Sequence, residues 1–134
     1  MEKTFLMVKP EVVAIGKQEE IIDILTKNGF VIRKSEQFTF SEERARRFYG
    51  MHEGKHFFED LIIYITSGPV IGLELEKDNA INDLRALVGA TDPAEAEPGT
   101  VRHAYGTDLR HNAVHASDSP ESAEKELAIV FAED

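Results

Sequence analysis

Short continuous apolar runs alternate with stretches in which apolar residues recur every three or four positions, as in a helix. This order restricts the fold more than any other feature of the sequence. Runs rich in strand-forming residues predict four strands, at residues 3–8, 30–40, 70–76 and 127–132. Apolar residues at helical spacing predict helices over about 17–27, 41–49, 57–66 and 78–89, with a short helix from Ser119. This order indicates an α+β fold of the ferredoxin-like, split βαβ type, a four-stranded antiparallel sheet covered by helices.

Capping and turn-forming residues mark the boundaries of these elements. Pro10 ends the first strand, because proline has no N–H to donate to a sheet. Asp78 and Gly89 are predicted to cap the two ends of one helix, and Ser119-Pro120 is a good pair for the start of another. Between the last helices, residues 90–112 form a long loop rich in Pro, Gly and Thr, and such a loop usually carries function.

Composition excludes several classes of function. A length of 134 residues suits a single domain over 1–134 with one core. The net charge of −10 repels nucleic acid, so binding to it is not expected. With no cysteine, disulfides, thiolate zinc sites and cysteine nucleophiles are excluded. No signal peptide or membrane span is recognisable, so we expect a cytoplasmic protein that does not bind membranes.

Three cations are candidates for binding phosphate. Lys9 lies where the first strand ends, Arg85 lies in the helix before Gly89, and Arg102 lies in the long loop. If the strand end and the loop converge, these side chains form a cradle for phosphates, with Thr91 and Asn112 nearby. The alternative is that Arg85 pairs with Glu76 or Asp83 and that the other two are solvated.

His115 is a candidate nucleophile. A neutral imidazole can form a phosphoramidate, provided that it has an open face and a partner that fixes its tautomer. Ser117 or Glu126 could be that partner, since Glu126 would lie near the end of the helix that begins at Ser119. The alternative is a structural histidine near a helix start.

Other candidates are weaker. The pairs His52/His56 and His111/His115 have the spacing of metal ligands on one helix face, but loop-forming residues surround them. Phe57 and Leu61 are four residues apart on a predicted helix and could clamp a planar ligand, although core packing is the default for both. No P-loop or dinucleotide-binding motif is present.

Longer motifs are more specific than these single residues. They read TFLMVKP, FYGMHEGKHFFEDL, ITSGPVIGLELE, LVGATDPAEAEPGTVRHAYGTD and NAVHASDSPESAEKE. In these motifs the chain resembles the nucleoside diphosphate kinase family nearly from end to end. The most specific of them contains the pattern Asn-x-x-His-(Gly or Ala)-Ser-Asp, where x is any residue. Residues Asn112 to Asp118 match this pattern.

The resemblance implies an activity and assigns roles. His115 would accept the γ-phosphoryl group of a nucleoside triphosphate, typically ATP, and pass it to a nucleoside diphosphate in a ping-pong reaction with low base specificity. Mg²⁺ would be held mainly by the nucleotide phosphates and not directly by the protein. The implied site residues are His115 with Tyr49 beside it, Ser117 and Glu126 as its orienting groups, Lys9, Arg85, Thr91 and Arg102 on the phosphates, Asn112 and Lys9 on the sugar, and Phe57 and Leu61 around the base.

The resemblance also implies a homo-oligomer, with a tetramer favoured slightly over a hexamer. Three departures from the family pattern are Glu11-Val12 in place of Asp-Gly, His103-Ala104 in place of Gly-Asp, and Ala116 in place of glycine. They concern the geometry of loops, because no residue with an assigned role is replaced. The alternative function is a catalytically silent sensor or scaffold that keeps the nucleotide pocket.

Overall fold

A computed structural model describes residues 1–109 and 111–131 of the chain. Its strands are β1 Glu2–Val8, β2 Val31–Phe38, β3 Val70–Lys77 and β4 Val114–Ala116. Its α-helices are α1 Pro10–Ala14, α2 Gln18–Lys27, α3 Glu42–Phe48, α4 Phe58–Ile65, α5 Ala80–Val88, α6 Val101–Tyr105 and α7 Pro120–Phe131. Two short 3₁₀ helices are η1 Gly50–His52 and η2 Pro93–Glu95.

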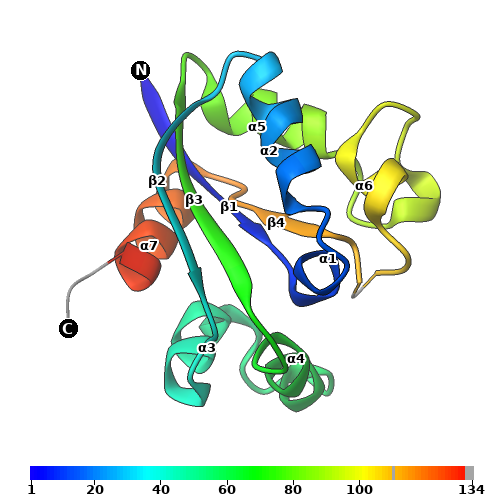
Figure 1. Cartoon of the computed structure of the whole chain (residues 1–134). Helices are drawn as coiled ribbons and strands as arrows, with labels where there is room; N and C mark the ends of the chain where they lie inside the picture. The colour runs from blue at the N-terminus through cyan, green and yellow to red at the C-terminus, as the bar shows by residue number, and fades with distance from the viewer. Residues whose placement is uncertain (110, 132–134) are drawn as a thin grey trace.

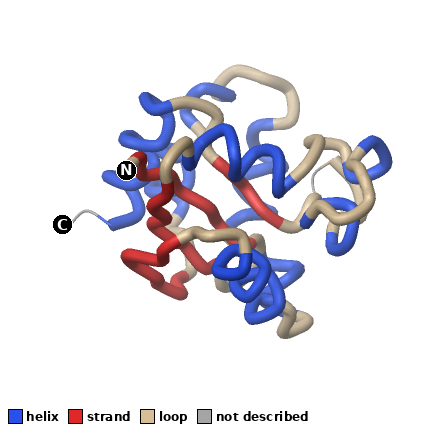
Figure 2. Tube along the Cα trace, turned by 90° about the horizontal axis from the view of Figure 1, so that it is seen from above, coloured by secondary structure: helices blue, strands red, loops and turns tan. Residues whose placement is uncertain are grey.

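The four strands form one antiparallel sheet in the order β2-β3-β1-β4, which confirms the predicted fold class (Figure 1). β1 lies inside the sheet and pairs with β3 along its whole length and with β4 near its end. The β1–β4 register sets Met7 opposite His115. Seen from above, helices lie on both sides of the sheet (Figure 2).

The core is divided between the two faces of this sheet. Leu6 and Val8 of β1 pack into one cluster, with residues of α1, α2 and α5, whereas Phe5 and Met7 pack into the other, with residues of α3, α4 and α7. Both faces of β1 are therefore buried, which explains why its sequence is a continuous apolar run without alternation.

The predicted strand at 127–132 is wrong, because residues up to Phe131 belong to helix α7 and Ala132 lies outside the described residues. The helix starts as expected, since the Ser119 hydroxyl accepts a hydrogen bond from Ser122 N at 3.1 Å and Pro120 is its first residue. It then continues, because Leu127 and Val130 are three residues apart and contact the same core cluster. The fourth strand is instead β4, Val114–Ala116, which lies after the predicted loop at 90–112 in a stretch for which no strand was predicted.

Two further boundaries differ from the prediction. The N-cap of α5 is Asn79, not Asp78; Asn79 has a φ of 57°, in the left-handed region that asparagine tolerates better than most residues. The region 90–112 was expected to be a loop but contains η2 and α6. Thr100 caps α6, because its hydroxyl accepts a hydrogen bond from His103 N.

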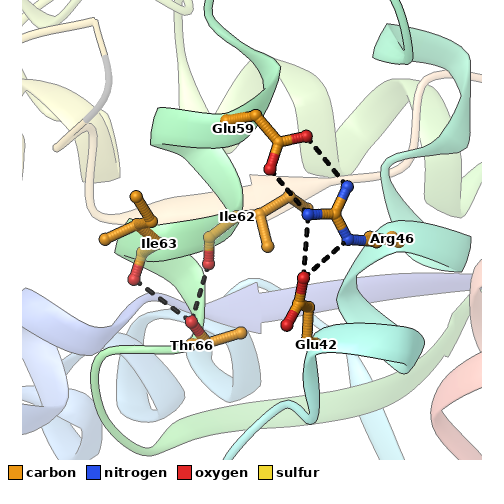
Figure 3. A network of polar contacts seen from close by, with 6 residues as sticks. All are labelled: Glu42, Arg46, Glu59, Ile62, Ile63 and Thr66. Carbon is orange, nitrogen blue, oxygen red and sulfur yellow. Dashed lines mark hydrogen bonds and ion pairs between the residues drawn. The ribbon is translucent and has the colours of Figure 1, made fainter.

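Helices α3 and α4 are joined by Arg46, which contacts both Glu42 and Glu59 (Figure 3). Its Nη2 atom lies 2.8 Å from Glu42 and 2.6 Å from Glu59, and the pKa of Glu59 is lowered, chiefly by its hydrogen bonds to Arg46. The Thr66 hydroxyl donates to Ile62 O at 2.8 Å and so helps to end α4. The Arg46 contacts link α3 to α4, two helices that border the site described next.

None of the helices in the described part of the chain is long and apolar enough to cross a membrane.

Candidate functional site

A cavity of about 340 Å³ lies beside β4. Nine of the residues predicted for the site line it: Lys9, Tyr49, Leu61, Arg85, Thr91, Arg102, Asn112, His115 and Glu126. These residues come from the end of β1, the helices α3 to α5, the segment around α6, the start of β4 and the middle of α7. The fold therefore brings together side chains that are more than one hundred residues apart in the sequence.

His115 lies on β4 and is oriented by a buried carboxylate. Its Nε2 atom is 2.8 Å from Oε1 of Glu126, whose side chain is almost fully buried. The Ser117 hydroxyl donates to the same oxygen at 2.6 Å. A carboxylate only accepts hydrogen bonds, so Nε2 carries the proton and the lone pair of a neutral imidazole is at Nδ1. Glu126 thus contacts His115 directly, whereas Ser117 acts on Glu126.

Aromatic rings surround the imidazole. Phe48 packs edge-on against it with ring centroids 5.2 Å apart, and Phe5 and Tyr49 lie 6.2 and 6.3 Å away. The Tyr49 hydroxyl is buried and makes no hydrogen bond to any described protein atom. Burial, followed by the charges of Glu126 and Glu11, raises the Tyr49 pKa, so this group stays a neutral donor. A buried donor on the wall of a cavity is suited to contact a ligand there.

Lys9 is a buried cation at the floor of this cavity. Its Nζ atom donates to Asn112 Oδ1 at 2.7 Å, and the Asn112 amide donates to Thr91 O at 3.0 Å. Burial lowers the Lys9 pKa to about 8, and Arg102 acts in the same direction, whereas Glu11 and Asp108 oppose them. Lys9 is therefore mostly protonated at neutral pH.

Arg102 and Arg85 provide two more positive charges. Arg102 is buried, and its guanidinium donates to Gly89 O and Val114 O, each at 3.0 Å. The Arg102 Nε atom is buried and has no hydrogen bond to a described protein atom. Burial, followed by the charge of Arg85, lowers the pKa of Arg102 to about 10. Arg85 is exposed on α5. The pairs proposed as the alternative for Arg85 are not observed, since Glu76 binds Arg33 and Asp83 binds Lys77.

Two of the predicted site residues do not line the cavity. Phe57 precedes α4 and packs beside the rings of His52 and His56, with centroids 5.3 and 5.6 Å away. Ser117 is fully buried behind Glu126.

The histidine pairs, which were weak candidates for metal binding, do not lie on α-helix faces. His52 lies in η1 and His56 in the turn after it, while His111 precedes β4 and His115 lies within it. His111 binds Asp108 and His115 binds Glu126. Among residues 1–109 and 111–131, no group of three or more His, Asp or Glu side chains could hold a metal ion.

Other residues that line the cavity were not predicted from the sequence: Phe48, Met51, His52, Leu109, Ala116, Asp118 and Ser122. Met51 and Leu109 are exposed apolar side chains at its border. The pKa of His52 is lowered, mainly by burial and then by Lys55 and His115, so the ring is neutral at pH 7. Asp118 could have been identified, because it belongs to the same short motif as His115.

Comparison with known proteins agrees with this geometry. The family model described as Nucleoside diphosphate kinase matches residues 2–134. Nucleoside diphosphate kinases of Pelotomaculum thermopropionicum and Archaeoglobus fulgidus are 46% and 48% identical to this chain over 134 residues, which is all of the chain and 90% and 89% of those proteins.

Solved structures show the same similarity. The nucleoside diphosphate kinase of Aquifex aeolicus has a TM-score of 0.95 and 40% identity, with 98% of this chain and 95% of that chain covered. A halophilic nucleoside diphosphate kinase of Halobacterium salinarum in complex with CDP has a TM-score of 0.94 and 41% identity, with 99% and 89% covered. With its cavity, its cations and its oriented histidine, the chain belongs to the nucleoside diphosphate kinase family.

Proposed function

We propose that the Nδ1 atom of His115 is the nucleophile of a ping-pong transfer of phosphoryl groups between nucleotides. Nδ1 attacks the γ-phosphorus of a nucleoside triphosphate, the bond from that phosphorus to the β,γ-bridging oxygen breaks, and a nucleoside diphosphate leaves. A β-phosphate oxygen of the second nucleoside diphosphate then attacks the phosphohistidine, and the N–P bond breaks. The observation that carries this proposal is the 2.8 Å contact of Nε2 with Glu126, which leaves the lone pair at Nδ1.

The cations supply what this reaction needs most. Phosphoryl transfer depends on positioning and on neutralising negative charge. Lys9, Arg85 and Arg102, with the exposed Thr91, would bind the phosphates, because all four line the cavity. Tyr49 would donate its unpaired hydroxyl beside the histidine, and Asn112 with Lys9 would contact the sugar hydroxyls.

The base would lie against apolar side chains at the border of the cavity. Leu61 lines the cavity from α4, with Met51 and Leu109 beside it, and Phe57 lies one turn before Leu61. Phe57 would have to turn toward the cavity to complete this clamp. Contacts of this kind do not read the edge of a base, so nucleotides with different bases are accepted. CDP in the Halobacterium salinarum structure is a nucleotide of the expected class.

Mg²⁺ would enter as part of the substrate, bound to the nucleotide phosphates. Asp118 is an exposed carboxylate on the cavity wall and the acidic side chain best placed to contact the metal or its water. Glu126, the other carboxylate on that wall, is already bound to His115 and Ser117. The metal would neutralise phosphate charge and add to the effect of the three cations.

We also propose that the chain, one domain over 1–134, assembles into a homo-oligomer through β2. This strand is at the edge of the sheet, and most of its residues are exposed. An antiparallel pair centred on Ser35 would place Lys34 opposite Glu36 of the second copy, so that the charges are complementary. Light scattering should give a mass that is a multiple of the 15.0 kDa chain. A mass of one chain would reject the assembly.

Intact mass spectrometry tests the catalytic proposal. Wild-type protein mixed with MgATP should gain the mass of one phosphoryl group, in an acid-labile form that is lost when GDP is added. His115→Ala should gain no mass, whereas His56→Ala should behave like wild type, because His56 does not line the cavity. If His115→Ala still gains an acid-labile phosphoryl group, the assignment of the nucleophile is wrong.

A further inference from the structure

Glu11 connects three segments of the fold without lining the cavity. Its Oε2 atom accepts a hydrogen bond from Ala113 N at 3.2 Å, and its Oε1 atom accepts one from the Tyr64 hydroxyl. Glu11 lies in α1, Tyr64 in α4, and Ala113 immediately before β4. The first turn of α1 is thus tied to the segment that leads into the strand of His115.

Ala113 is held at both of its peptide groups. Its N–H binds the Glu11 carboxylate, and its carbonyl accepts from Lys9 N at 2.9 Å. Its φ is 77°, in the left-handed region that a residue with a Cβ occupies only at an energetic cost. Such a conformation persists where the surrounding contacts impose it. Here those contacts come from Lys9 and Glu11.

Ala113 lies between two residues that are proposed to take part in the reaction, Asn112 and His115. Asn112 precedes it and binds Lys9 Nζ through its side chain. Val114 follows it, accepts from Arg102 and leads directly to His115. A change in the backbone at Ala113 would therefore move Asn112 and His115 relative to Lys9 and Arg102.

We infer that Glu11 is a positioning residue for phosphoryl transfer, which holds the Asn112–His115 segment through Ala113 and places a negative charge beside Lys9. This inference rests on the proposed role of His115. Tyr64 supports it by holding the second carboxylate oxygen, which fixes the direction of the first. Glu11 contacts neither the nucleophile nor the cavity, so its action is indirect.

The charge of Glu11 also acts on Lys9, because it raises the pKa of that lysine. Among the described residues, the charges that act on Lys9 include Glu11 of α1, Arg102 of α6 and Asp108 of the following loop, and Asn112 adds a neutral contact. Glu11 is the largest influence that raises the Lys9 pKa against burial. Without it, the Lys9 pKa falls further below about 8, and the lysine loses its proton at a lower pH.

Two substitutions separate charge from contact. Glu11→Gln removes the charge but keeps an oxygen for Ala113 N, whereas Glu11→Ala removes both. Tyr64→Phe removes one hydrogen bond and keeps the charge. Glu19→Gln on α2 is the matched control, because Glu19 is an exposed carboxylate away from the cavity. For each variant we would measure kcat and kcat/KM from pH 6 to pH 10, with the phosphoenzyme of the wild type measured in parallel.

In Glu11→Gln, the alkaline fall of kcat/KM should occur at a pH lower by roughly one unit, since a nearby charge shifts a pKa by about that much. Glu11→Ala should in addition lower kcat roughly tenfold, as expected when a buried hydrogen bond to a charged group is lost. Tyr64→Phe should lower kcat less and leave the limb in place. Glu19→Gln should match wild type.

An unmoved alkaline limb in Glu11→Gln would overturn the inference, and so would a wild-type kcat in Glu11→Ala. If Glu11→Ala does not fold, the pH of the alkaline limb in Glu11→Gln still tests the inference. A role in stability alone would lower the unfolding temperature without moving the limb. Failure of the proposed function is distinct, because the wild type would then form no phosphohistidine at all.

Discussion

His115 Nε2 and Glu126 Oε1 lie 2.8 Å apart, although one belongs to a three-residue strand and the other to the middle of a helix. Strand β4 is held by β1, with His115 opposite Met7, and α7 packs against the same sheet. The tautomer of the histidine therefore depends on how a helix lies on a sheet.

Glu126→Ala should slow the formation of the phosphoenzyme by roughly 100-fold, because the imidazole loses the group that fixes its tautomer and balances its developing charge. Rapid-quench measurement with labelled ATP gives this rate directly. Ser117→Ala is the graded comparison: it removes one donor from Glu126 and leaves the contact with His115, so its loss should be several times smaller. Equal rates for wild type and Glu126→Ala would contradict the orienting role.

The activity should fall above about pH 8. Burial lowers the Lys9 pKa to about 8, so a rise in pH through this value removes a positive charge that is proposed to bind phosphate. The profile of kcat/KM reports this pKa of the free enzyme, whereas a bound nucleotide anion favours the ammonium and moves the limb in kcat to higher pH. In Lys9→Arg the limb near pH 8 should disappear, since a guanidinium keeps its proton there. If the limb persists in Lys9→Arg, another group is responsible for it.

Arg85→Ala and Arg102→Ala should differ in their effect on stability. Each removes a cation from the cavity, so each should raise KM for nucleotide roughly tenfold or more. Arg85 is exposed, and its loss should leave the midpoint of urea unfolding unchanged. Loss of Arg102 leaves Gly89 O and Val114 O without a buried donor and should lower the free energy of unfolding by about 2 kcal/mol. An identical change of midpoint in both variants would contradict this distinction.

Gly72→Ala should destabilise the fold and reduce activity together. A Cβ at Gly72 would lie 2.9 Å from Val130 Cγ1 of α7 and 3.2 Å from Phe5 Cε1. Overpacking of this kind costs about 1–3 kcal/mol and would push α7, and with it Glu126, away from the sheet. Gly50→Ala is the control, since nothing lies within 4 Å of a Cβ there. Thermal unfolding and kcat would be compared for both variants, and equal unfolding temperatures would show that α7 adjusts without cost.

Much of the fold could be predicted from the sequence, because most helices and strands have a clear spacing of apolar residues and recognisable capping residues. Ser41 illustrates this: its hydroxyl accepts from Arg44 N at 3.1 Å, as expected for the N-cap of α3. The end of the chain could not be predicted in the same way. Residues 127–132 have the composition of a strand, yet packing of Val130 against the sheet keeps 127–131 in a helix. β4 is too short for a period to be seen.

Most of the charged residues that line the cavity were predicted, with Asp118 as an exception, whereas most of the apolar residues that shape it were not. Lys9, Arg102 and His115 have side chains that can bind or accept phosphate, so a motif that contains them suggests a function. Met51 and Leu109 are ordinary apolar residues, and only the tertiary structure brings them to the border of one cavity. The ties of Glu11 to Tyr64 and Ala113 likewise depend on segments far apart in sequence.

The order β2-β3-β1-β4 places the edge proposed for assembly and the strand of the proposed nucleophile on opposite sides of the sheet. His115 is on β4 at one edge of the sheet, and the edge proposed for pairing between copies is β2, with two strands between them. Each copy then keeps a complete cavity of its own, and no residue needs to be supplied across the β2 pair. Subunits should therefore turn over independently, with hyperbolic saturation by nucleotide. Oligomers that mix wild-type and His115→Ala chains should show activity in direct proportion to the wild-type fraction.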